Sequence, residues 1–139
     1  MVSMKAFIQL FFLAALLFFG ASTHAGRDKP ILNIYNTNVN WPSGVEATDK
    51  KVERAIIIAC TQLGWICSVT KPGEIHGRLN LRTHQADVRI PYNIESYSII
   101  FEAAVNLRHN VVKNTIHRNY NNWIMNLQKN INTAIAATP

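Results

Sequence analysis

The segment from Glu74 to Tyr92 restricts the fold most, because apolar and polar side chains alternate along it with the period of β-strands. One face carries Ile75, Gly77, Leu79, Leu81 and Thr83, and after Gln85 the apolar set becomes Ala86, Val88, Ile90 and Tyr92. A two-residue hairpin turn at His84-Gln85 explains this one-residue phase shift. It sets apolar residues opposite one another and Arg82 opposite Asp87. A β-bulge is the alternative, because His-Gln is not a preferred turn pair.

A second hairpin is predicted directly after the first. A loop over residues 93–96 pairs Tyr92 with Tyr97, and the same register pairs Val88 with Phe101. It also sets the carboxylates of Asp87 and Glu102 against each other, which is unfavourable. Pro91 lacks a backbone donor, so we expect antiparallel strands with some irregularity near Pro91.

Two amphipathic helices flank these strands. The first begins after Thr48, a good N-cap, and ends at Gly64, a common helix stop. The second follows an apolar stripe at helical spacing, formed by Ile116, Tyr120, Trp123, Ile124, Leu127, Ile131 and Ile135. Its aromatic residues belong to the stripe, so they are expected in the core, and the many asparagines are expected on the solvated side.

These elements predict an α+β fold. We expect a four-stranded antiparallel meander with two helices packed on one face, and an extra short N-terminal strand at Ile31–Tyr35 as an addition. Residues 48–139 are expected to form a single α+β domain. Residues 26–47 are expected to form an N-terminal segment and loop.

Residues 1–25 have the layout of a secretory signal peptide. Lys5 is followed by an apolar run from Ala6 to Phe19, and small residues precede the expected cleavage point after Ala25. This run is shorter than the about 20 apolar residues that a membrane span needs. The alternative to a cleaved signal peptide is an uncleaved inner-membrane anchor. We expect export, with the periplasm as the first compartment and secretion as the second. The sequence has no cysteine near the end of this run to which a lipid could be attached, so no covalent membrane anchor is expected.

The exported chain is basic. Of the 14 Lys and Arg residues only Lys5 precedes Gly26, which leaves 13 against 8 acidic side chains. A positive surface favours anionic partners such as lipid headgroups, cell-wall polymers or nucleic acid, and export makes nucleic acid the least expected of them. The alternative is a mildly basic surface without a partner.

Cys60 and Cys67 are the only thiols. An even pair in an oxidising compartment favours a disulfide, because a helix end followed by a strand brings the two close together. Two buried, unpaired thiols are the alternative. The spacing is not CxxC, so it indicates neither redox catalysis nor zinc.

Several stretches carry a resemblance to a known group of proteins: GRLNLRTHQADVRIPY, SYSIIF and IHRNYNNWIMNL. Together they are similar to a family of small exported bacterial proteins, many of which look like lipoproteins and for which no activity is established. The resemblance spans residues 48–131 and implies export and an α+β domain. It carries over no catalytic residue, and this chain departs from the pattern by lacking the lipid-bearing cysteine.

One face of the predicted sheet is cationic. It carries His76, Arg78, Asn80, Arg82 and Arg89, with Asp87 and Glu102 as partial counter-charges. His76, Arg78, Arg82 and Arg89 are therefore the candidate ligand- or partner-binding residues. The alternative is a solvated face whose exposed ion pairs contribute about 0.2–1 kcal/mol each.

A polar cluster of His84, His117 and Arg118 is expected where the hairpin meets the second helix. Histidines are common metal ligands, but no recognised ligand spacing is present, so neither a metal nor a cofactor is predicted. Neither a nucleophile elbow nor a Gly-rich phosphate loop occurs. The sequence thus favours a small exported binding or scaffold protein that docks an anionic envelope component. A periplasmic hydrolase using the junction histidines and a secreted effector are the alternatives.

Overall fold

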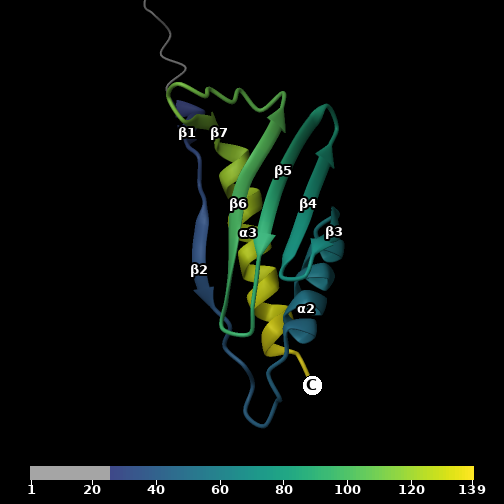
Figure 1. Cartoon of the computed structure of the whole chain (residues 1–139). Coiled ribbons are helices and arrows are strands. Elements are labelled where there is room, and N and C mark those ends of the chain that lie inside the picture. Colours follow the sequence, from purple (N-terminus) through teal and green to yellow (C-terminus); the bar gives the residue numbers. More distant parts are fainter. Residues whose placement is uncertain (1–25) are drawn as a thin grey trace, which may run out of the picture.

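The computed structural model describes residues 26–139; the predicted signal peptide lies outside them. The main feature is a five-stranded antiparallel sheet in the order β2-β6-β5-β4-β3 (Figure 1). Its strands are β2 (Ile34–Asn38), β3 (Trp65–Lys71), β4 (Glu74–Leu81), β5 (His84–Pro91) and β6 (Ser96–Val105). Strands β1 (Asp28–Pro30) and β7 (Thr115–His117) form a separate two-stranded sheet, and the helices are α2 (Asp49–Gln62) and α3 (Arg118–Ala136).

The α+β prediction is confirmed, and the strand count is corrected. β3 to β6 form the expected meander, and β2 adds a fifth strand along β6. β2 lies three residues later in the chain than the extra strand expected at Ile31–Tyr35. Its pairing is interrupted by a register shift between Ile34 and Thr37, where Asn36 has a φ of 48°. Such an irregular edge strand carries too little alternation to be located from sequence.

The first hairpin turns two residues earlier than predicted. Leu81 pairs with His84, so Arg82 and Thr83 form the turn, and Asp87 faces Arg78 instead of Arg82. Arg82 adopts a left-handed φ of 56°, a conformation that two-residue hairpin turns favour. The predicted register was wrong by an even number of residues. The assignment of side chains to the two faces therefore survives, because faces alternate with a period of two.

The second hairpin is close to the prediction. Tyr92 bridges to Tyr97 and Val88 pairs with Phe101, as expected. The predicted opposition of Asp87 and Glu102 is wrong, because a register shift between Asp87 and Val88 places Ala103 opposite Asp87. The irregularity thus lies where two carboxylates would otherwise have met.

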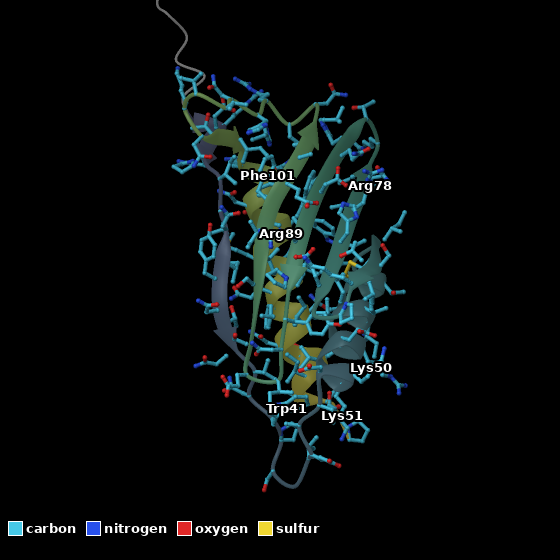
Figure 2. The ribbon with its side chains drawn as sticks, in the orientation of Figure 1. Trp41, Lys50, Lys51, Arg78, Arg89 and Phe101 are labelled. Atoms are coloured by element: carbon cyan, nitrogen blue, oxygen red, sulfur yellow. A yellow bond between two sulfur atoms is a disulfide. The ribbon has the colours of Figure 1, made fainter. Side chains whose placement is uncertain are left out.

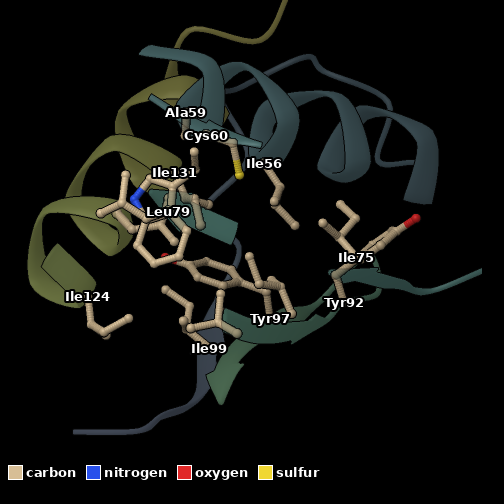
Figure 3. Packing of buried hydrophobic residues seen from close by; sticks show 14 of the residues in the cluster. Ile56, Ala59, Cys60, Ile75, Leu79, Tyr92, Tyr97, Ile99, Ile124 and Ile131 are labelled. Atoms are coloured by element: carbon tan, nitrogen blue, oxygen red, sulfur yellow. The ribbon is translucent and has the colours of Figure 1, made fainter. Parts of the chain in front are cut away.

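Both helices lie on one face of the sheet, and the other, called the open face below, is free of them (Figure 1). Thr48 caps α2 by accepting a hydrogen bond from the Lys51 amide, as predicted. α3 begins two residues later than the apolar stripe, because Ile116 lies in β7. The core between sheet and helices is fully enclosed around Tyr97, Ile99, Ile124 and Ile131 (Figure 3). Trp123 only packs against its rim.

Cys60 and Cys67 form a disulfide with their Cα atoms 6.1 Å apart, which confirms the favoured pairing. The bridge joins the last turn of α2 to the middle of β3. Between them Gly64 turns the chain with a φ of 77°, which a residue with a side chain rarely adopts. The sheet edge and the helix that covers it are therefore covalently linked.

Tyr120 packs its ring edge-on against Phe101, with centroids 5.4 Å apart, and is fully buried. Its hydroxyl has no hydrogen-bond partner in the described part of the chain, and burial raises the pKa of the phenol. We expect Tyr120→Phe to raise the free energy of unfolding by about 1 kcal/mol, because it removes an unsatisfied buried group and keeps the ring. Urea denaturation measures this; a loss of stability would show that the hydroxyl has a partner in solution.

Candidate functional site

Three of the four candidate binding residues lie together on the open face. Arg78 projects from β4 and Arg89 from β5 (Figure 2). His76 lies on β4 directly opposite Arg89. Arg82 does not join them, since it lies in the β4–β5 turn at one end of the sheet. The predicted basic face therefore holds two arginines and one histidine.

Each of these side chains is matched by an acid. Arg78 Nε donates to Asp87 Oδ1 at 2.6 Å, and His76 Nε2 lies 3.3 Å from the same atom. His76 also lies 3.4 Å from Glu102, and Arg89 Nη1 donates to Glu74 at 3.3 Å. Asp87, Glu102 and Glu74 together match the two arginines and the histidine, so this group of side chains has no net positive charge.

Asp87 is the centre of this network and is only 4% exposed. Burial alone would raise the pKa of its carboxyl group. The hydrogen bonds from Arg78 and from Gln85, at 2.6 and 2.7 Å, outweigh burial and hold the pKa below its ordinary value of 3.8. The carboxylate is therefore charged at neutral pH and is engaged within the sheet. The arrangement has the character of a structural ion-pair network.

The excess positive charge gathers elsewhere, at the end of the sheet where α3 begins. This cationic end consists of residues 27–30, which include β1, together with the β4–β5 turn, the β6–β7 connection and the first residue of α3 (Figure 1). It carries six cations and one acid: Arg27, Lys29, Arg82, Arg108, Lys113 and Arg118, with Asp28. The seven other cations of the described chain are balanced by seven acids, so this end holds the whole net charge.

Backbone and side-chain contacts hold the segments of the cationic end together. The Arg118 amide donates to the Arg27 carbonyl at 2.8 Å, which joins the start of α3 to the segment before β1. The Asn106 side chain donates to the Thr83 carbonyl at 2.8 Å and so ties the β6–β7 connection to the β4–β5 turn. Arg108 reaches Asp28 at 3.1 Å. The segments that carry the six cations are thus connected to one another.

The predicted junction residues His84, His117 and Arg118 all belong to this end, but the histidines act separately. His84 Nδ1 lies 2.8 Å from the Asn106 carbonyl, and His117 Nδ1 accepts from the Asn119 amide at 3.2 Å as the N-cap of α3. His109 packs edge-on against Phe101, at 4.7 Å between centroids. Among residues 26–139 no group of His, Cys, Asp or Glu side chains could hold a metal ion.

Two hollows lie away from the cationic end. One, of about 390 Å³, runs between α2 and the C-terminal part of α3 and is lined by Lys51, Arg54 and Ile58 among others. The other, of about 310 Å³, lies beside Glu53 and Tyr92. The Lys50 and Tyr92 hydrogen bonds lower the pKa of Glu53. Burial and Glu53 raise the pKa of Tyr92 to about 12. Both shifts move the pKa values of these groups further from neutral pH, where a general acid or base would need them.

Comparison with known proteins finds no matching family model, no similar curated protein and no similar solved structure. The search for transmembrane helices finds no helix among residues 26–139 that is long and apolar enough to cross a membrane.

Sequence reasoning missed Arg27, Lys29, Arg108 and Lys113 as members of one surface. A signal was present, because no acidic residue follows Glu102 in the chain. All four of these cations are distant in sequence from Arg82, however, and only the folded chain brings them to one end. Charge counting along the chain therefore identifies the acid-free segment but does not locate the surface.

Proposed function

We propose that this protein is a small exported binding or scaffold domain that docks an anionic envelope component through its cationic end. The supporting observation is the separation of charge: one end holds the entire net charge, and the remainder is balanced. A surface of one sign attracts a polyanion through the summed field of its charges, even when each individual contact is weak.

The start of α3 adds to this field. The helix N-terminus carries a partial positive charge, and its first turn contains no acidic residue. Arg118 lies at this position, so the helix dipole and a side-chain cation have the same sign. An anion approaching this end would therefore meet both.

The proposal moves the binding surface away from the open sheet face. Arg78 and Arg89 hold Asp87 and Glu74, and a ligand would have to displace these acids before it could bind. The cations of the cationic end face one acid, Asp28, which Arg108 engages. The hydrolase alternative has less support, because Nδ1 of both junction histidines is engaged by the backbone.

Co-sedimentation of the 26–139 domain with envelope fragments tests the proposal. We expect pelleting at low salt and release at about 0.5 M salt, because salt screens exposed charges over a few ångströms at that concentration. Absence of pelleting at low salt would contradict docking to an anionic envelope component.

A further inference from the structure

The β6–β7 connection exposes two valines at its tip. Val111 is 78% exposed and Val112 is 96% exposed, and they are the two most exposed large apolar side chains of residues 26–139. They are adjacent in the chain, so they form one exposed apolar tip. Neither side chain packs in the core of the domain.

The turn that carries the valines is well defined. Asn110 and Thr115 pair through two backbone hydrogen bonds of 2.8 and 3.2 Å, and the Asn110 side chain accepts from the Lys113 amide at 2.9 Å. The Asn114 carbonyl also accepts from the Ile31 amide at 3.1 Å. The exposure of the valines is therefore a property of a fixed turn, since hydrogen bonds on both sides hold its base.

Positive backbone φ angles also indicate that this connection has a fixed conformation. Asn106, Arg108 and Asn114 have φ angles of 56°, 54° and 51°, so three of the five non-glycine residues with positive φ among residues 26–139 lie in this one connection. For arginine the left-handed conformation is unfavourable, and it persists only where surrounding contacts maintain it. The ion pair between Arg108 and Asp28 is such a contact.

The apolar tip belongs to the cationic end. Arg108 and Lys113 flank the valines within the connection, and Arg27, Lys29 and Arg118 belong to the same end. An apolar tip within a set of cations matches a bilayer with anionic headgroups, where apolar side chains enter the interface and cations meet the phosphates. A soluble polyanion would use the cations but not the valines.

We propose that the Val111-Val112 turn inserts into the interface of a lipid bilayer with anionic phosphate headgroups. This inference rests on the proposed function and specifies the lipid surface as the anionic partner. The domain would then stand with the C-terminal end of α3 pointing away from the bilayer.

Vesicle binding tests the insertion. The probes are vesicles of phosphatidylglycerol mixed with phosphatidylcholine, and vesicles of phosphatidylcholine alone. We expect binding to the mixed vesicles, and about 10-fold weaker binding when Val111→Ser and Val112→Ser are combined, because two apolar side chains no longer leave water. The matched control combines Ile66→Ser and Val69→Ser, which alters two exposed apolar residues of β3 and is expected to leave binding unchanged.

A second variant reports depth directly. The fluorescence of Val112→Trp is expected to shift to the blue and to be quenched by brominated lipids beyond the quenching of the unchanged protein. If salt-sensitive vesicle binding persists while the serine pair has no effect and no added quenching occurs, insertion is overturned and docking stands. Pelleting with envelope fragments but not with mixed vesicles would identify a non-lipid anionic component and overturn the lipid assignment. Binding to neither would overturn both proposals.

Discussion

Combining Arg27→Glu, Lys29→Glu and Arg118→Glu is expected to abolish the salt-sensitive binding of the domain to envelope fragments. A cation near an anionic surface contributes about 1 kcal/mol. Loss of three such attractions weakens binding by about 3 kcal/mol, or more than 100-fold, and the new carboxylates add repulsion. The three side chains are exposed, so the fold should be retained. Arg27 and Arg118 contact each other through a backbone hydrogen bond, which the substitutions keep.

The matched control reverses three cations outside the cationic end. Lys51→Glu, Arg54→Glu and Lys129→Glu change the net charge by the same amount, and none of these cations forms an ion pair among residues 26–139. Co-sedimentation at low salt should remain close to that of the unchanged protein. Equal loss in both triple variants would mean that net charge alone governs binding, and that the cationic end is not a distinct surface.

Asp87→Asn is expected to lower the free energy of unfolding by about 3 kcal/mol. It leaves the geometry nearly unchanged but removes the charge that Arg78 and Gln85 bind and that His76 approaches. Breaking a buried pair costs about 3–5 kcal/mol. We expect the lower value of this range because the Arg78 side chain is 46% exposed, so water can solvate its charge when its partner is neutral. Urea denaturation of both proteins at neutral pH measures the difference.

Glu102→Gln provides the control for this network. Glu102 approaches only His76, and its side chain is 42% exposed. Its loss should change stability by no more than about 0.5 kcal/mol, as for other exposed ion pairs. Equal effects of the two substitutions would show that the burial of Asp87 is not what makes its interactions strong.

The effect of Asp87 should depend on pH in a defined direction. Its folded pKa lies below the ordinary value of 3.8, so its contribution is complete above that value and is lost as the pH falls through the folded pKa. The stability difference between the unchanged protein and Asp87→Asn is therefore expected to be constant near neutral pH and to shrink below about pH 4. A difference that grows on acidification would contradict the lowered pKa.

Local patterns predicted the helices, the α2 cap and the faces of β4 and β5, because each depends on residues close in sequence. The disulfide followed from the short separation of Cys60 and Cys67. The first hairpin register failed because alternation fixes faces but not the position of the turn, and Arg82-Thr83 fits as well as His84-Gln85. β2 was placed too early because its pairing with β6 is a long-range contact with an irregular register.

The candidate site was harder to predict for the same reason. The sequence indicated cations on β4 and β5 with Asp87 and Glu102 as partial counter-charges, but only the folded sheet shows that Glu74 also pairs with Arg89. The cationic end joins β1, the β4–β5 turn and the segment from the β6–β7 connection to the start of α3, and more than 20 residues separate each of these three parts from the next. Likewise, Val111 and Val112 belong to no strand or helix pattern, so their exposure became apparent only in the fold.

Amide NMR spectra of the 26–139 domain, titrated with short-chain polyphosphate, test the central claim most directly. Polyphosphate is a soluble polyanion, so it reports where anionic charge binds independently of lipid. The account predicts that shifts cluster at Arg27, Lys29, Lys113 and Arg118 and disappear at high salt. Shifts centred on His76, Arg78 and Arg89 would contradict it and return the binding surface to the open face of the sheet.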